Sequence, residues 1–266
     1  MFKIGCCMNM TAKNESKVGE EAIPLFAKMG FDYIELPLAQ VMDLSDVKFN
    51  DLLRQIRTGG IPMEACNNFF PARIRLTGED AKPDLITEYV KAATGRAAAM
   101  GAKIIVLGSS GAKNIPQGFP YESALVQLKE LLVQIDEIVA PLGITIALEP
   151  LNRNESNFIT TASEGLELVQ DLSLDNIKLL IDYYHLRMED EDFAVINEAG
   201  PDLRHLHIAS KEGRLFPKPG DGENYGLFFA RLKAIGYEGR VSVEAKSQDL
   251  AADGAAALKL LRSLIY

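Results

Sequence analysis

The 266-residue sequence contains no tryptophan and only three cysteines and three histidines. The three cysteines (Cys6, Cys7 and Cys66) are an odd number, two of them are adjacent, and no C-x-x-C spacing occurs. A disulfide framework and a cysteine-based zinc site are therefore not expected. All three lie in or at the end of apolar segments, which predicts buried thiols.

Basic residues are also in short supply. Lys and Arg number 28 against 37 Asp and Glu, which gives a formal net charge of −9, and no long basic cluster occurs. A protein that binds nucleic acid needs a concentrated basic surface to neutralise phosphates, so a nucleic-acid partner is not expected, and neither is an anionic membrane.

Long apolar runs are missing as well. No segment approaches the roughly 20 apolar residues that span a bilayer. The N-terminal MFKIGCCMNM lacks a long apolar stretch followed by a small-residue cleavage site, so it does not resemble a signal peptide. These absences predict a cytoplasmic location.

Short apolar segments alternate with longer amphipathic segments about eight times along the chain. The predicted strands are 2–8, 33–36, 61–66, 103–108, 144–148, 178–181, 203–209 and 240–245. The predicted helices are 16–29, 84–100, 122–140, 163–172, 192–199, 225–235 and 250–265. This alternation is typical of α/β proteins with a parallel sheet and helices outside it.

Eight such units favour closure into a single (β/α)₈ barrel over residues 1–266, a length close to the roughly 250 residues usual for that fold. A doubly wound open sheet is the competing architecture. No G-x-G-x-x-G or G-x-x-x-x-G-K-[ST] motif follows a predicted strand, so this alternative gains little support.

Acidic residues directly follow three of the later strands. Glu149 follows ITIAL, Asp182 follows KLLI, and Glu244 follows RVSV, while His207 lies near the end of the intervening strand. In a barrel these four positions face one cup at the C-terminal end of the strands. Each residue alone would more often be solvated or paired, but four on consecutive strand ends indicate a shared site.

Three carboxylates in one partly desolvated cup require compensation, because burial and mutual repulsion would raise their pKa values. A divalent cation resolves this conflict. One imidazole and three carboxylates form an oxygen-rich ligand set, which suits Mn²⁺ first, then Mg²⁺, with Co²⁺ and Zn²⁺ as further options. We therefore expect Glu149, Asp182, His207 and Glu244 to bind one metal ion.

Three further titratable residues lie on or near the ends of predicted strands. His205 is expected to fill a lower layer of the barrel interior and to form hydrogen bonds there, since residues two apart on a strand face the same side. Glu35 and Glu64, on the second and third strands, could either line the same cup or pair with basic neighbours.

Four segments resemble a known family. E-P-L-N-R-N-E (149–155), D-Y-Y-H (182–185), H-L-H (205–207) and V-E-A (243–245) resemble the xylose isomerase-like sugar isomerases and epimerases. The ketose 3-epimerases of the D-tagatose and D-psicose group are the most similar, and the hydroxypyruvate isomerases are also near. The resemblance implies a metal-dependent isomerase, a sugar substrate and a homodimer or homotetramer.

The resemblance also implies roles for individual residues. It assigns metal binding to the four strand-end residues and acid/base catalysis to Glu149 and Glu244. Substrate contacts carry over to Glu155, His185 and Arg214. The segment H-I-A-S-K-E-G-R departs from the family's H-x-G-E, and the family's tryptophans near the sugar have no counterpart here.

The expected reaction is epimerisation at C3 of a ketose through a metal-bound cis-enediolate. Glu149 and Glu244, on well-separated strands, would remove a proton from one face of the carbon and return one to the other. Aldose–ketose or hydroxypyruvate isomerisation would use the same metal site and acid/base residues. An inosose-type dehydration also begins with removal of a proton beside a carbonyl. A barrel that binds a sugar or metal without catalysis is the non-enzyme alternative, whereas an endonuclease IV-type nuclease would need more histidines and a basic surface.

The segment 211–222 contains Lys211, Arg214 and Lys218 together with three glycines. It lies where barrels often bind phosphate, so it could bind a phosphorylated sugar, although a solvated lid is the expectation that we prefer.

Overall fold

Eight short strands form the centre of the molecule in the computed structural model, which describes residues 2–265. They are β1 (Lys3–Cys7), β2 (Tyr33–Pro37), β3 (Met63–Asn67), β4 (Ile104–Leu107), β5 (Thr145–Leu148), β6 (Ile177–Asp182), β7 (Leu203–Ile208) and β8 (Arg240–Val243). All neighbours pair in parallel in sequence order, and β8 pairs with β1 to close the barrel. The predicted (β/α)₈ barrel is confirmed.

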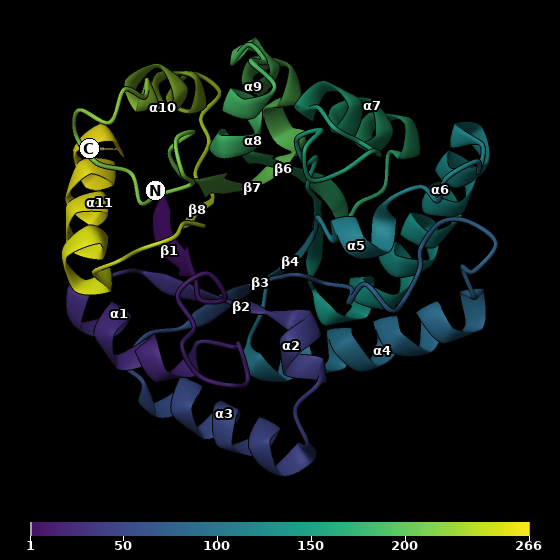
Figure 1. Ribbon diagram of the computed structural model, residues 1–266, viewed down its shortest axis with the longest axis horizontal. Coiled ribbons are helices and arrows are strands. Elements are labelled where there is room, and N and C mark those ends of the chain that lie inside the picture. The colour runs from purple at the N-terminus through teal and green to yellow at the C-terminus, as the bar shows by residue number, and fades with distance from the viewer. Residues whose placement is uncertain (1, 266) are drawn as a thin grey trace.

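Helices surround this barrel on its outside (Figure 1). The longer ones are α1 (Ile23–Met29), α3 (Asp46–Thr58), α4 (Pro83–Met100), α6 (Tyr121–Val139), α7 (Ala162–Leu172), α10 (Tyr225–Ala234) and α11 (Leu250–Ile265). Short helices lie in the connections: α2 (Leu38–Met42), α5 (Ser110–Lys113), α8 (Tyr183–Met188) and α9 (Ala194–Ala199), with 3₁₀ turns η1 (Glu20–Ala22), η2 (Ala140–Leu142) and η3 (Gly200–Asp202). None of these described helices combines the length and apolar character needed to cross a membrane.

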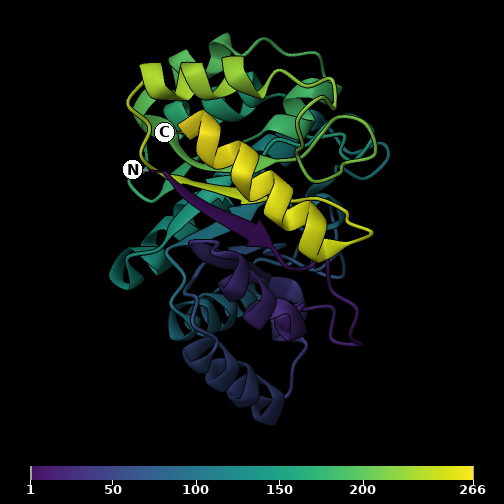
Figure 2. The ribbon, with the colours of Figure 1, turned by 90° about the vertical axis from the view of Figure 1, so that its left-hand side faces the viewer.

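The helical ring closes where the chain ends. Helix α11 packs between α1 and α10, so the last helix lies beside the first, as the turned view shows (Figure 2). Gly30 and Gly101 end α1 and α4 in the left-handed conformation, with φ of 88° and 100°, directly after the predicted helix ends at 29 and 100.

Two helices differ from the sequence expectation. The helix predicted over 16–29 is shorter, because Gly19 at φ 85° precedes a separate 3₁₀ turn and Pro24 stands in the first turn of α1. Helix α3 was not among the predicted helices. It begins at a Ser45 cap, whose hydroxyl accepts a hydrogen bond from the Lys48 N–H. Only Leu52 is fully buried, while Phe49, Leu53 and Ile56 are half-buried against the core.

The apolar core has two parts. The larger lies between the strands and the helices, and a smaller layer fills the barrel interior with Tyr33, Ala65, Ile104, Val106, Ala147 and Leu180. Gly5 on β1 makes room for the Tyr33 ring, because a Cβ at this position would lie 2.4 Å from it. This interior layer forms a floor beneath the polar residues at the C-terminal mouth.

Candidate metal centre

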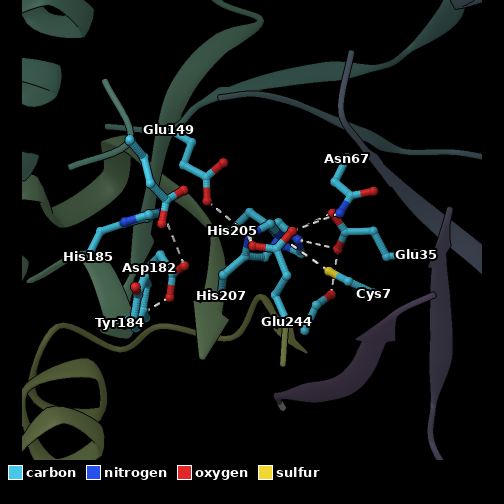
Figure 3. Close-up of polar contacts among 12 residues, drawn as sticks. Cys7, Glu35, Asn67, Glu149, Asp182, Tyr184, His185, His205, His207 and Glu244 are labelled. Atoms are coloured by element: carbon cyan, nitrogen blue, oxygen red, sulfur yellow. Dashed lines mark hydrogen bonds and ion pairs between the residues drawn. The ribbon is translucent and has the colours of Figure 1, made fainter. Parts of the chain in front are cut away.

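The four predicted ligands come together at the C-terminal mouth of the barrel. Glu149 directly follows β5, Asp182 ends β6, His207 is the penultimate residue of β7, and Glu244 directly follows β8. All four are buried. One candidate ligand atom from each lies within 4.8 Å of those of the other three (Figure 3).

The His207 ring lies between the two glutamates. Its Nδ1 is 3.0 Å from Glu149 Oε1 and 3.4 Å from Glu244 Oε2, so this nitrogen faces the centre of the cluster. Asp182 uses Oδ1 to accept a hydrogen bond from the Tyr184 N–H at the start of α8, which leaves Oδ2 facing the same centre. Each residue thus presents one atom to a common point.

Electrostatics show that this cluster is short of positive charge. Burial raises the pKa of Asp182 to about 7 and also raises the pKa of Glu149. Burial acts in the same direction on Glu244, but the charges of Arg214 and His207 hold its pKa below the usual value. The pKa of His207 is raised well above its usual value, because the surrounding acidic groups outweigh burial. A divalent cation fits this donor set, since a dication and the Arg214 guanidinium together balance three carboxylates.

Arg214 reaches the cluster from the loop after β7. Its Nη2 lies 3.3 Å from Asp182 Oδ2 and also donates to Glu244 Oε2, while its Nη1 lies 3.3 Å from Glu155 Oε1. The guanidinium stacks over the Tyr184 ring, 4.6 Å from its centroid. The residue adopts a left-handed backbone with φ of 52°, so this loop is held in an uncommon conformation for a non-glycine residue.

His185 has a defined arrangement of its ring nitrogens. Nδ1 accepts hydrogen bonds from the Asn152 backbone N–H at 3.2 Å and from its side-chain amide at 2.8 Å, so the ring proton belongs on Nε2. Burial holds the pKa of His185 well below its usual value, which keeps the ring neutral. Nε2 is buried without a hydrogen-bond partner and lies 3.6 Å from Asp182 Oδ2. It is a donor available to a bound molecule.

Glu35 and Glu64, for which the sequence left two possibilities, have different surroundings. Glu64 pairs with Lys3 and Arg240, each at 2.6 Å, at the N-terminal end of the barrel, so it does not line the cup. Glu35 lies inside the barrel and bonds to both His205 and His207. The expectation that His205 is a buried, hydrogen-bonded residue of a lower layer is confirmed.

The basic residues of segment 211–222 do not form one cluster. Lys211 Nζ pairs with Asp190 at 2.9 Å, whereas Arg214 faces the carboxylates of the candidate metal ligands. Glu223, just beyond the segment, accepts hydrogen bonds from Tyr183 and from the Lys211 backbone N–H, so the loop is tied to α8. This arrangement gives no support to a phosphate site there.

Sequence reasoning missed two polar residues beside the catalytic candidates. Asn67, the last residue of β3, donates from Nδ2 to Glu244 Oε1 at 2.8 Å. The fully buried Lys113 donates to the Glu149 backbone carbonyl at 3.1 Å. Asn67 carries the same strand-end signal that identified the candidate ligands, whereas Lys113 is the last residue of the short helix α5 and gives no such signal.

The fold and this cluster define a (β/α)₈ barrel with a candidate divalent-metal centre at its C-terminal mouth. Residues 23–264 match the model of the xylose isomerase-like TIM barrel family, and the chain belongs to that family. The resemblance seen in the sequence is therefore confirmed.

Relatives and solved structures agree with this assignment. The D-psicose 3-epimerase of Agrobacterium fabrum is 30% identical over 230 residues, which cover 82% of this chain and 76% of that protein. The structure of D-psicose 3-epimerase with D-tagatose from Clostridium cellulolyticum superposes with a TM-score of 0.85 at 21% identity and covers 99% of both chains. A structure of the IOLI protein with a zinc atom superposes with a TM-score of 0.77 at 24% identity, over 99% of this chain and 98% of that one.

Proposed function

We propose that this protein is a divalent-metal-dependent sugar epimerase that inverts C3 of a ketose. The observation that carries the proposal is that Glu149 and Glu244, from β5 and β8, both approach the same atom, His207 Nδ1. The 3-epimerase activity named for the Agrobacterium relative supports the choice of reaction.

Epimerisation needs a base on one face of the carbon and an acid on the other. Glu149 and Glu244 extend from β5 and β8, which are well separated around the barrel, so they approach a central substrate from different sides. Burial raises the pKa of Glu149, whereas Arg214 and His207 lower the pKa of Glu244. The two carboxyls therefore differ in acidity in the metal-free protein.

Three further residues would bind and orient the substrate. The neutral His185 ring donates from Nε2 to a substrate oxygen. Arg214, held by the Tyr184 ring and by Glu155, donates to a second oxygen. Glu155 in turn accepts from Asn152 and is available to a substrate hydroxyl. Together they would hold the carbonyl end of the sugar so that the C3 proton faces a glutamate.

The metal site would be formed by Glu149, Asp182, His207 and Glu244. Mn²⁺ is the ion we expect, and Mg²⁺, Co²⁺ and Zn²⁺ also suit these ligands. When bound, the ion would act as a Lewis acid that stabilises the negative charge developing on the substrate oxygens as the proton leaves. The residues of the chain perform the proton transfers themselves.

The test is deuterium exchange by NMR. Protein loaded with Mn²⁺ and a chelated control are incubated in D₂O with D-psicose, D-fructose, D-tagatose and L-ribulose, and the product is freed of metal before spectra are recorded. We expect metal-dependent deuterium at C3 together with the C3 epimer. Deuterium at C1 instead would indicate aldose–ketose isomerisation, and a loss of water from the product would indicate a dehydratase.

Glu149→Gln and Glu244→Gln should each abolish epimerisation, because each glutamine can neither accept nor return the proton. Glu64→Gln, the same change at the opposite end of the barrel, is the matched control and should retain exchange. Full epimerisation by both variants would contradict the two-glutamate scheme.

A further inference from the structure

A carboxylate beneath the candidate metal centre has no role in the reaction proposed above. Glu35 lies on β2 inside the barrel and is fully buried. An isolated carboxylate in such a place would be strongly destabilising unless its oxygens were satisfied by hydrogen bonds. Its neighbours therefore show what it does.

Glu35 accepts hydrogen bonds from three side chains on two strands. Oε1 accepts from His207 Nε2 at 3.0 Å, and Oε2 accepts from His205 Nε2 at 2.8 Å and from Ser242 Oγ at 2.5 Å. The Ser242 hydroxyl in turn lies 2.7 Å from the Tyr33 hydroxyl in the barrel floor. Figure 3 shows Glu35 beside the two histidines, on the side away from Glu149 and Asp182.

We propose that Glu35 is a positioning residue for the metal centre, which holds the His207 ring in place and keeps the ring proton on Nε2. The inference rests on the proposed metal site. A neutral imidazole carries one proton, and a carboxylate that accepts at Nε2 keeps it there. Nδ1, the nitrogen between Glu149 and Glu244, then offers its lone pair to the cation. Carboxylates commonly orient metal-binding histidines in this way.

The rest of the network fixes Glu35 itself. His205 lies on β7, the strand that carries the proposed ligand His207. Ser242 lies on β8, which the proposed ligand Glu244 directly follows. A shift of the carboxylate would break hydrogen bonds to both, in a buried place where an unsatisfied group costs about 1–3 kcal/mol. Glu35 therefore couples the orientation of His207 to the two strands that bear metal ligands.

A second cation is the rival explanation, because Cys7, Glu35 and His207 could themselves hold an ion. Cys7 Sγ lies 3.7 Å from His207 Nε2. Both Glu35 oxygens already accept hydrogen bonds, however, so an ion there would have to displace the His207 donor and compete with His205 and Ser242. The positioning role predicts one ion per chain, and the rival predicts two.

The first experiment measures metal affinity of purified protein by competition with a chromogenic chelator, with Co²⁺ as the probe. Glu35→Gln should weaken Co²⁺ binding about 10–100-fold, the usual cost of losing a hydrogen-bond partner of a metal ligand. Its amide has only one accepting oxygen, so it cannot satisfy both histidines. The visible spectrum of bound Co²⁺ should change as well, because the ring reorients.

Tyr33→Phe is the matched control, since it removes a buried hydrogen bond from the far end of the same network without touching Glu35. It should lower the melting temperature and leave Co²⁺ affinity and spectrum as in the wild type. Wild-type affinity and spectrum in Glu35→Gln, or two ions per wild-type chain, would overturn the inference. If the wild type binds no metal at all, the proposed function fails instead.

A second measurement needs no variant at Glu35 and so does not depend on how that variant folds. The chain has only three histidines, so ¹⁵N–¹H correlation spectra of the Zn²⁺-loaded wild type are simple, and His185→Gln and His205→Gln assign the signals. We expect His207 to be protonated at Nε2 and metal-bound at Nδ1. Protonation at Nδ1 would refute the positioning role.

Discussion

Gly108 lies against the carboxylate of Glu149, which makes it a sharp test of the proposed site. It follows β4, and an added Cβ would lie 2.3 Å from Glu149 Oε2 and 3.3 Å from its Cδ. Ordinary contacts between non-bonded heavy atoms begin near ~3.5 Å, so Gly108→Ala should push the carboxylate aside by about 1 Å. The glycine has no left-handed backbone, so alanine brings no strain of that kind.

The expected effect on catalysis is much larger than the effect on folding. A displacement of about 1 Å in a reacting group can lower kcat/KM ~10²-fold, which corresponds to about 2.7 kcal/mol. Overpacking costs about 1–3 kcal/mol of stability, and here the lower end applies because the contact is with the end of a side chain. Metal affinity should fall too, since Glu149 is a proposed ligand.

The assay follows C3 epimerisation and Co²⁺ affinity, together with thermal unfolding of the metal-free protein. Gly95→Ala in helix α4 is the matched control, because nothing lies within 4 Å of its added Cβ. This control should be as active as the wild type and slightly more stable, by about 0.5–1 kcal/mol. Wild-type turnover and metal binding in Gly108→Ala would refute the placement of Glu149 in the site.

Two further predictions concern pH. Burial raises the pKa of Asp182 to about 7 from 3.8, so in the metal-free protein this group lowers the free energy of unfolding as pH rises across that interval. Because a bound cation needs the ionised carboxylate, Mn²⁺ should raise the melting temperature more at about pH 7.5 than at about pH 5.5; equal shifts would contradict this. Burial lowers the pKa of Lys113 to about 8 from 10.5, so the folded protein loses this proton first and its free energy of unfolding should rise with pH over that range, by up to about 1.4 kcal/mol per pH unit. Urea unfolding at several pH values should show this slope in the wild type and not in Lys113→Met, and an unchanged slope would count against it.

The fold was predictable because its units repeat. Strands buried on both faces give short apolar runs such as 103–108, and the helices between them show an apolar stripe. Helix α3 escaped prediction because most of its residues are polar and only Leu52 is fully buried. The start of α1 was misplaced because the left-handed Gly19 breaks a pattern that otherwise continues.

The candidate site was predictable where residues end strands. Glu149, Asp182, His207 and Glu244 could be grouped from sequence alone, because the carboxyl ends of parallel strands meet at one mouth. Their role as metal ligands stays a prediction. The function of Glu35 could not be predicted from the sequence. Its partners His205, His207 and Ser242 lie on β7 and β8, far away in the sequence, and only closure of the barrel brings them together. Lys113 was hidden for a similar reason, because a loop folds back to place it under Glu149.

The apolar floor of the barrel closes one end of the candidate site. Among the residues that the structure describes, Tyr33, Ile104, Val106 and Leu180 belong to an interior layer whose side chains are almost wholly inaccessible to solvent. A cup closed in this way opens only at its C-terminal mouth, so under the proposed function a sugar would enter and leave by the same opening. Under the proposed function the product would have to leave before the next substrate could enter, and Arg214, in the loop after β7, lies beside that opening.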